Sequence, residues 1–446
     1  MIWHVSQSFT QDSIQSNTGG ITIHNQAQNK QLKPDVSNKA KNIFLTIYAF
    51  YLVLFGFLMD KPSTIVKGLH SIVVSPDILI TDYIVVGGMG ACFVNAGLLT
   101  LASILLLSLL RIDVDGRSIV AIFLMSGFAL FGKNIINIWI IIFGVYLYSK
   151  LKKERFSNHV ITALLGTSMA PAVTELLFHI EKPFYLRLIL ALLIGSLIGF
   201  IMPPISSHVF PFHQGFNLYN VGFAAGIIGT VAVSIFISYG FETRSHLLWS
   251  TGNNMVLSCF LSILFLGFIL TGYLMNGRSI RGVGTILKRD GCLSSDFVRT
   301  EGFGASLINM GLNGFIGMIY VLAVGGALNG PTIGGILTIV GFGAYGKHAR
   351  NILPVILGVF IGVLTKIWDI NDPRLLLAAL FGTALAPISG VFGWKLGILA
   401  GFINSSVVLS VGVLHGGMNL YNTGFSSGIV AAIMVPVIRS LKKSKE

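Results

Sequence analysis

Long apolar runs, separated by short polar gaps, make up most of the chain from Ile43 to Ile438. A helix needs about 20 consecutive apolar residues to cross a bilayer, and many of the runs come close to this length. The gaps are too short to hold a separate folded domain. The pattern therefore predicts an all-α polytopic membrane protein with one membrane domain.

The chain contains an internal duplication, which is its most informative feature. Fifteen residues from His213 match fifteen from His415 in the pattern H-x-G-x-N-L-Y-N-x-G-F-x-x-G-I, with ten identities. Weaker matches precede this block in the same order: Gly132-Lys133 with Gly346-Lys347, and Gly166-Thr167 with Gly382-Thr383. The matches predict two copies of one unit, a first membrane repeat at 43–241 and a second at 255–438.

Polar segments flank and join the two repeats. Residues 1–42 are rich in Asn, Gln and Ser and are predicted to form a disordered cytosolic tail. They lack the apolar core that a signal peptide needs near its start. Residues 242–254 are the predicted inter-repeat loop, and residues 439–446 are a predicted basic cytosolic tail.

Each repeat divides into about seven apolar segments, and several do not fit a simple crossing helix. As helices, residues 118–132 and 331–345 would rise only ~22 Å, whereas the hydrocarbon core is about 30 Å thick. Residues 84–110 are longer than one straight crossing requires. Short pieces at equivalent positions indicate re-entrant helices, and long pieces that contain Gly and Asn indicate broken ones. Asp82 and Asp296 precede equivalent segments and are predicted helix N-caps.

The charges in equivalent gaps indicate how the two repeats are oriented. The gap at 150–155 is strongly basic and its counterpart at 366–374 is balanced, whereas the weakly charged gap at 60–82 corresponds to a basic one at 277–300. Because basic loops favour the cytosolic side, equivalent gaps tend to lie on opposite faces. This predicts two inverted-topology repeats, each with seven full spans or with five spans and two re-entrant pieces.

The composition excludes a water-soluble globular protein, because 53% of the residues are hydrophobic and only 11% are charged. The net charge of +13 lies mainly in the gaps between apolar runs, so it indicates membrane orientation rather than nucleic-acid binding. The three cysteines show no metal or disulfide spacing and are expected to be packing residues. No nucleotide-binding or hydrolase motif is present, so neither an enzyme nor a cofactor is expected.

The duplicated motif is the strongest candidate for a binding site. Equivalent residues of inverted repeats can converge near the midplane of the membrane, and Asn residues three apart share a helix face. The motif's glycines would let a solute or another helix approach closely. The substrate-binding residues predicted from the motif are Asn217, Tyr219, Asn220, Asn419, Tyr421 and Asn422. The alternative is that these residues only hold helices together.

Three further pairs of repeated polar residues are predicted to bind substrate: Asn95 and Asn309, Thr167 and Thr383, and Lys133 and Lys347. The two lysines could attract an anion, or they could extend from a surface turn into water. The two threonines precede Ala-Pro pairs, which are typical of a helix break where freed backbone groups can bind an ion. The two asparagines lie in apolar stretches, where they would line a cavity or serve packing.

Three residues are candidate proton relays. His213 and His415 lie just before the motif helices, and an imidazole titrates in the physiological range; a structural role is the alternative. Glu175 is the one carboxylate well within an apolar run, and its equivalent is Val391. The two histidines have no nearby Cys or carboxylate in the motif, so no metal site is expected.

The duplicated motif resembles that of a bacterial family of uncharacterised membrane proteins, which is defined by a duplicated domain of unknown function. The resemblance extends from residue 43 to the C-terminus. It implies a multi-pass protein of the bacterial cytoplasmic membrane, and the charge pattern places both termini in the cytosol. The plan of two inverted halves with short segments also resembles urea channels, in architecture only.

Three functional hypotheses follow from these patterns. The first is a secondary transporter for a small polar or anionic solute, with alternating access between the inverted repeats. The second is a passive channel for a small neutral solute, and the third is a membrane scaffold, a sensor or an enzyme with an unrecognised site. The expected partners are a small-molecule or ion substrate and the lipid bilayer, without nucleic acid, and the architecture is compatible with a homo-oligomer.

Overall fold

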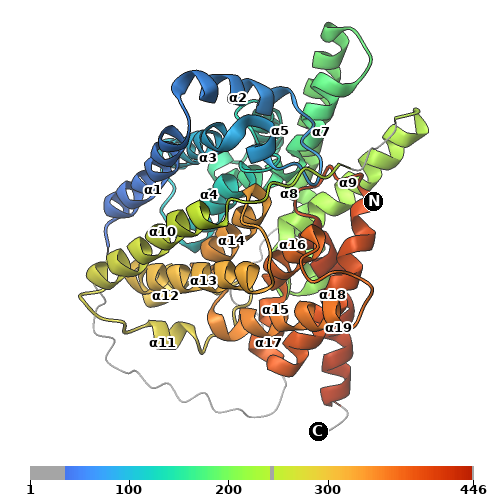
Figure 1. The fold of residues 1–446 in the computed structure, drawn as a ribbon. Coiled ribbons are helices and arrows are strands. Elements are labelled where there is room, and N and C mark those ends of the chain that lie inside the picture. The colour runs from blue at the N-terminus through green and yellow to red at the C-terminus, as the bar shows by residue number, and fades with distance from the viewer. Residues whose placement is uncertain (1–35, 242–245, 444–446) are drawn as a thin grey trace. The chain divides into compact units, whose positions relative to one another are not determined.

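The structure, a computed structural model, describes residues 36–241 and 246–443, and in these ranges every regular element is a helix (Figure 1). The first repeat consists of α1 (Asn38–Met59), α2 (Pro62–Val74), α3 (Tyr83–Leu109), α4 (Gly116–Phe128), α5 (Ile138–Leu151), η1 (Phe156–Asn158), α6 (Val160–Gly166), η2 (Thr167–Met169), α7 (Ala170–Thr174), η3 (Glu175–His179), α8 (Phe184–His213) and α9 (Asn220–Ser238). The second consists of α10 (Asn254–Met275), α11 (Val283–Ile286), α12 (Phe297–Glu301), α13 (Phe303–Ala323), α14 (Gly330–Phe342), α15 (Ala349–Leu364), α16 (Pro373–Gly382), η4 (Thr383–Leu385), α17 (Ala386–Phe392), α18 (Trp394–Leu414) and α19 (Asn422–Lys443).

Ten helical stretches of the described chain are long and apolar enough to cross a membrane, and each repeat contributes five of them. Two of the ten, α6–η3 and α16–α17, are interrupted by short 3-10 turns at η2 and η4. Each turn is followed by a helix with proline in its first turn, as the sequence predicts. The all-helical membrane fold is therefore confirmed.

Four shorter apolar helices form one hairpin in each repeat, α4–α5 in the first and α14–α15 in the second. Asp115, just before α4, and Asn158, just after α5, line the same cavity, so the first hairpin enters and leaves on one face. Asp372, just after α15, lines a second cavity together with His246. Each repeat thus has five stretches of crossing length and one hairpin of shorter helices.

The short helices α4 and α14 run antiparallel to each other in the centre of Figure 1. The backbone N–H of Gly116, at the start of α4, donates to Asp296 Oδ2 at 3.1 Å. The N–H of Gly330, at the start of α14, donates to Asp82 Oδ1 at 3.2 Å. Each Asp also caps its own helix, as predicted. The first turn of each short helix is therefore completed by a side chain of the other repeat.

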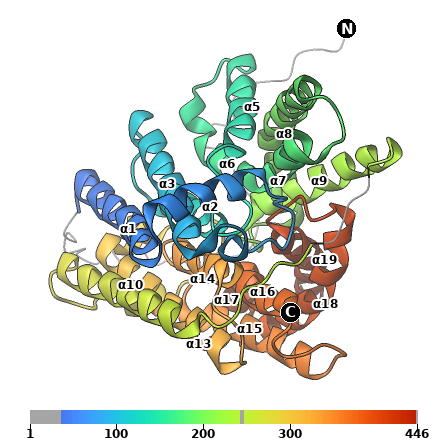
Figure 2. The same ribbon diagram turned by 45° about the horizontal axis from the view of Figure 1, so that its top comes forward.

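The long helices enclose this central pair. Helices α1 and α10 lie at the left in both ribbon views, and α18 and α19 lie at the right (Figures 1 and 2). The hairpin helices pack on long helices through glycine. For example, Gly144 of α5 lies against Gly199 of α8, and a Cβ atom added to either glycine would overlap the backbone of the other helix. Such small-residue contacts are common between membrane helices.

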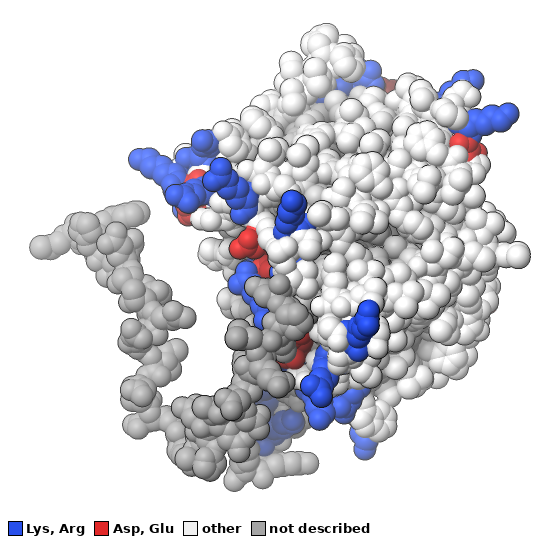
Figure 3. Space-filling model, turned by 90° about the vertical axis from the view of Figure 1, so that its left-hand side faces the viewer, with Lys and Arg blue, Asp and Glu red and all other residues white. Residues whose placement is uncertain are grey.

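The surface fits a lipid environment. Large apolar side chains are exposed along the long helices, including Leu54, Leu193 and Leu270 at 58–65%. Figure 3 shows Lys and Arg side chains in two groups, with a broad surface almost free of charge between them. The uncharged surface is where a hydrocarbon core would lie.

The predicted segment boundaries agree with most helices, but α8 runs ten residues past the predicted end at 203, α2 lies in the predicted gap at 60–82, and the ends of the chain differ. Ser37 accepts a hydrogen bond from Ala40 N and starts α1 at Asn38, inside the range predicted as the 1–42 tail. Helix α19 continues to Lys443, into the range predicted as the basic tail 439–446. Residues 1–35, 242–245 and 444–446 of the predicted tails and inter-repeat loop lie outside the described residues.

Candidate functional site

The two copies of the motif meet at the starts of α9 and α19. A Cβ on Gly424 would lie 2.9 Å from the Cα of Gly222, so this contact requires glycine. Asn217 Nδ2 donates to Gly424 O at 3.0 Å, and Asn419 Nδ2 donates to Gly222 O at 3.4 Å. Equivalent residues of the two repeats therefore converge, as inverted repeats allow.

The amides of Asn217 and Asn419 are already paired. Both are fully buried, and their Oδ1 atoms accept hydrogen bonds from the backbone N–H groups of Tyr219 and Tyr421, each at 3.0 Å. The expectation that Asn217 shares a helix face with Asn220 is wrong, because α9 begins only at Asn220. In this conformation the two amides hold the repeats together, which was the alternative to a substrate-binding role.

The two tyrosines of the motif each accept a hydrogen bond from a lysine of the other repeat. Lys347 Nζ donates to Tyr219 OH at 2.6 Å and to Thr383 Oγ1 at 2.7 Å. Lys133 Nζ donates to Tyr421 OH at 2.9 Å. Both lysines are fully buried, so the prediction that they extend from a surface turn into water is wrong.

Aromatic rings surround each ammonium group. Lys133 Nζ lies 5.4 Å from the ring centroid of Phe128 and 4.9 Å from that of its tyrosine partner. Lys347 Nζ lies 4.9 Å from Phe342 and 4.6 Å from its tyrosine partner. Over residues 36–241 and 246–443, neither ammonium group has a carboxylate within ion-pair distance. Ring faces and hydroxyl oxygens stabilise a cation but leave its charge uncompensated.

The hairpin tips position the lysines. Asn95 Nδ2 donates to the backbone oxygen of Lys133 at 2.9 Å, and Asn309 Nδ2 donates to that of Lys347 at 2.8 Å. The glycine before each lysine has a positive φ, 125° in the first tip and 95° in the second, a conformation that residues with a Cβ rarely adopt. Asn95 and Asn309 therefore act as anchors of the tips.

Two cavities of similar size lie beside the starts of α9 and α19, and the two tyrosines line the first of them. The first vestibule has a volume of about 470 Å³ and is lined by Asp115, Arg117, Asn158, Asn220, Tyr219 and Tyr421. The second vestibule has a volume of about 420 Å³ and is lined by Leu79, His246, Asp372, Arg374, Leu420 and Asn422. The equivalent residues Asn220 and Asn422 thus line one vestibule each, so the cavities follow the pseudo-symmetry of the repeats.

Aromatic side chains separate the two vestibules. The space between them has a volume of about 10 Å³ and is lined by Tyr219, Tyr421, Phe128 and Phe381. A cavity of this size holds one water molecule at most. The tyrosines that bind the buried lysines therefore also line the small space between the two cavities.

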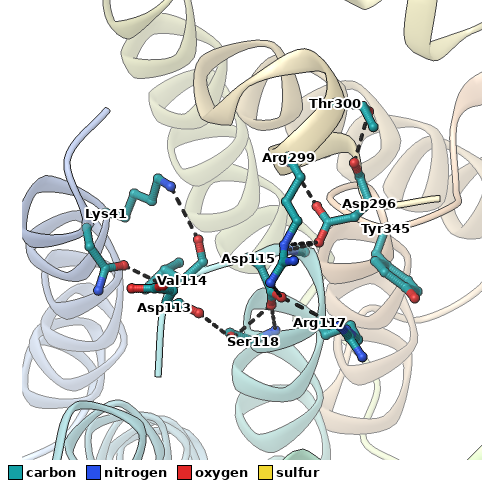
Figure 4. Close-up of polar contacts among 12 residues, drawn as sticks. Lys41, Asp113, Val114, Asp115, Arg117, Ser118, Asp296, Arg299, Thr300 and Tyr345 are labelled. Atoms are coloured by element: carbon teal, nitrogen blue, oxygen red, sulfur yellow. Dashed lines mark hydrogen bonds and ion pairs between the residues drawn. The ribbon is translucent and has the colours of Figure 1, made fainter. Parts of the chain in front are cut away.

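A charged network lies beside the mouth of the first vestibule (Figure 4). Arg299 forms an ion pair with Asp115 at 2.7 Å and lies 3.6 Å from Asp296. Arg117 lies 3.9 Å from Asp115. At the second vestibule, Arg374 forms an ion pair with its neighbour Asp372 at 2.7 Å. Each mouth therefore holds acidic and basic side chains, whereas the two buried lysines have no carboxylate partner among the described residues.

The predicted proton relays His213 and His415 bind the first residues of the motif helices. His213 Nε2 lies 2.8 Å from Asn220 Oδ1, and His415 Nε2 lies 2.9 Å from Asn422 Oδ1. Asn220 Nδ2 also donates to Ser206 O at 2.9 Å. These bonds join each motif helix to the long helix before it, a structural role that leaves the proton-relay prediction open.

The remaining predicted residues lie near the helix breaks. Thr167 Oγ1 donates to Leu164 O at 2.5 Å, and Thr383 Oγ1 donates to Leu380 O at 2.6 Å, so each threonine satisfies a carbonyl at its break. Glu175 lies in η3, is 9% exposed, and its Oε1 has no hydrogen-bond partner. In the described parts of the chain, no group of three His, Cys, Asp or Glu could hold a metal ion.

Two features of the site escaped the sequence analysis. Phe128 and Phe342 stack beside the lysines, although their repetition after Gly127 and Gly341 is visible in the sequence. Asp77 is a fully buried carboxylate in a polar gap, and its equivalent is Gly291. A search for polar groups repeated in both copies cannot find a residue that only one copy carries.

The fold and the site together define a class: a multi-span helical membrane protein built from a duplicated domain. A family model described as protein of unknown function (DUF1576) matches residues 61–238 and again residues 275–440. The chain therefore belongs to the DUF1576 family, and the two matches coincide with the two repeats. No curated protein and no solved structure matches the chain.

Proposed function

We propose that the protein moves a small anionic solute across the membrane along the two vestibules, and that Lys133 and Lys347 attract the anion at the barrier. The observation that carries the proposal is the pair of fully buried ammonium groups whose hydrogen-bond partners are neutral. An uncompensated charge in a region of low dielectric is costly, and an anion at the barrier would offset that cost.

The mechanism favoured by the pseudo-symmetry is secondary transport. Each tyrosine of the barrier belongs to one repeat and its lysine to the other, so a rocking motion of one repeat against the other would change both contacts together. Inverted repeats commonly provide alternating access in this way. The anion would replace the tyrosine hydroxyls as the partner of the ammonium groups during passage.

A passive channel is the second candidate, and one observation favours it. The vestibules have similar volumes, about 470 and 420 Å³, and the barrier is a single layer of side chains. A rearrangement of Tyr219 and Tyr421 alone would then join them. A channel and a transporter differ in exchange: when the membrane potential is clamped at zero, unlabelled anion trapped inside liposomes stimulates the uptake of labelled anion through a transporter and not through a channel.

The test uses purified full-length protein in liposomes, with chloride, nitrate and phosphate as anions and urea as the neutral solute. We expect flux of at least one anion, and we expect the double variant Lys133→Met/Lys347→Met to lower it about tenfold or more, which corresponds to ~1.4 kcal/mol. Lys395→Met, at an exposed lysine, is the control and should leave the flux unchanged. An unaltered anion flux in the folded double variant, or flux of urea alone, would contradict the proposal.

We also infer the orientation and the membrane. Four arginines lie on the face that bears the first vestibule: Arg117, Arg289, Arg299 and Arg439. Basic residues favour the cytosolic side of a membrane. This face would be cytosolic in the cytoplasmic membrane of a bacterium. Cysteine labelling of intact cells tests this: Ser157→Cys should be protected from an impermeant reagent, and Asp369→Cys should react.

A further inference from the structure

Asp77 lies in the loop between α2 and α3 and is fully buried. Its Oδ2 accepts hydrogen bonds from Asn134 Nδ2 at 3.1 Å, from Asn137 Nδ2 at 2.8 Å and from Thr174 Oγ1 at 2.5 Å. The hydroxyl of Tyr83 donates to its Oδ1. Within the described ranges, no Lys, Arg or His forms an ion pair with this carboxylate. Four neutral donors from three different elements therefore surround one buried acid.

The hydrogen-bond network determines which of these donors can instead accept a hydrogen bond from Asp77. Asn134 Oδ1 accepts from the N–H groups of Ile136 and Asn137, both at 3.0 Å, and Asn137 Oδ1 accepts from Asn134 N at 2.9 Å. The amide nitrogens of both asparagines must therefore face Asp77. A hydroxyl can donate or accept, so the carboxyl can hold a proton on Oδ1 if the hydroxyl of Tyr83 turns to accept it.

We propose that Asp77 is a proton-binding site and that its protonation loosens the α4–α5 tip, which carries Lys133. One proton binds Oδ1 and no other group loses one. The ionised acid accepts four hydrogen bonds, whereas the protonated acid donates one to Tyr83 and accepts weaker, uncharged bonds from Asn134, Asn137 and Thr174. The inference rests on the proposed transport function and names the proton as its coupling ion.

Two further titratable groups lie near Asp77. Glu175 follows Thr174 in η3, and its Oε1 is buried and has no hydrogen-bond partner. His179, whose ring bonds to the backbone of Val74 and Ser75, is the other titratable group of η3 that faces the loop. Burial raises the pKa of the Asp77 carboxyl, hydrogen bonds from Thr174, Tyr83 and Asn137 lower it, and the charge of Glu175 raises it further.

The hairpin tip connects this acid to the proposed anion pathway. Lys133 immediately precedes Asn134, and its ammonium group points away from Asp77 to the barrier tyrosine Tyr421 at 2.9 Å. If the hydrogen bonds from Asn134 and Asn137 to Asp77 weaken, the tip can move, and Lys133 can then move away from Tyr421. Proton binding at one end of the tip would then alter the cation at the barrier.

The direct test is infrared difference spectroscopy of the full-length protein in liposomes while the pH is lowered. We expect a carbonyl band of a newly protonated carboxyl that is absent from Asp77→Asn and present in Glu175→Gln. The Asn side chain resembles the protonated acid, since its oxygen can accept from the three donors and its nitrogen can donate to Tyr83. A band that persists in Asp77→Asn, or that only Glu175→Gln removes, would overturn the proposal.

A second variant keeps the test decisive if Asp77→Asn does not fold. Tyr83→Phe retains the carboxyl but removes one hydrogen bond, which is stronger to the ionised form than to the neutral one. The midpoint of the infrared titration should therefore move up by roughly 0.5–1 pH unit. An unchanged midpoint would count against the site.

Anion flux then separates this inference from the proposed function. With the chloride, nitrate and phosphate panel, a pH gradient should drive accumulation in the wild type. Asp77→Asn should lose the response to the gradient, whereas the control variant Lys395→Met should keep it. If no anion moves in the wild type, the transport proposal fails and the infrared result still decides the proton site. If Asp77→Asn responds to the gradient like the wild type, the coupling role is overturned.

Discussion

Asn137 and Asn351 occupy equivalent positions at the tips of the two hairpins and make the same local contact. Asn137 Nδ2 donates to Gly132 O at 3.2 Å, and Asn351 Nδ2 donates to Gly346 O at 2.8 Å. The external anchors of the tips differ. The first tip is held by the side chain of Asp77, whereas the second is held through His348, whose Nε2 lies 2.9 Å from the backbone oxygen of Arg289.

The space that Asp77 fills in the first repeat is filled by backbone in the second. A Cβ on Gly291, the equivalent position, would lie 2.2 Å from Gly346 O. A Cβ on Gly390, the equivalent of Thr174, would lie 1.9 Å from the backbone oxygen of Asp290. Two copies of one fold can thus keep the same tip geometry while only one of them keeps an acidic anchor.

The largest effect is expected from Asp77→Ala, which removes the acceptor and leaves buried amide and hydroxyl donors unpaired. We expect a loss of about 3–5 kcal/mol in the free energy of unfolding, measured as a fall in melting temperature of the protein in detergent. Asp77→Asn, which restores an acceptor, should recover most of the loss. An Asp77→Ala protein as stable as the wild type would show that the first tip does not depend on its carboxylate.

Gly291→Ala tests the second anchor. The new Cβ would overlap Gly346 O and lie 2.4 Å from Asn351 Nδ2, at a φ of +74° that alanine rarely adopts. Overpacking and backbone strain together should destabilise the protein by about 2–3 kcal/mol, seen in the same melting assay. Gly284→Ala, where nothing lies within 4 Å of the new Cβ, is the matched control and should be harmless. Equal melting temperatures for both variants would mean that the backbone of the second tip can move aside.

The smallest expected difference separates Thr383 from Thr167. Each hydroxyl donates to a carbonyl three residues earlier, at 2.6 and 2.5 Å, but only Thr383 also accepts from Lys347, at 2.7 Å. Thr383→Val should therefore cost about 1 kcal/mol more than Thr167→Val. Paired melting curves measure the difference, and identical curves would remove the hydroxyl of Thr383 from the support of the lysine.

The sequence predicted the duplication, the inversion and the crossing segments, because apolar runs and loop charges encode them directly. It left open whether the short segments cross, since a run of 15 residues has the same composition in a re-entrant hairpin as in a tilted helix. In the structure, Asp115 and Asn158, at the two ends of the first hairpin, line the same cavity.

The candidate site was predicted in part. The convergence of Tyr219 and Tyr421 and the importance of Lys133 and Lys347 followed from their repetition. The pairing of each lysine with the tyrosine of the other repeat could not be predicted, because spacing within one copy carries no information about contacts with the other. The directions of the Asn217 and Asn220 side chains depend on where α9 begins, and the turn before it includes Gly215 at a φ of +82°.

The caps that Asp82 and Asp296 place on α14 and α4 make each half of the chain incomplete by itself. A lone half would leave the first backbone N–H of its short helix without the carboxylate that accepts from it. An ancestor that carried one copy would therefore have been stable as a pair of identical subunits inserted in opposite directions, and gene fusion would have preserved that pairing. Two separately expressed halves of the present protein should reassemble for the same reason, provided that they enter the bilayer in opposite senses.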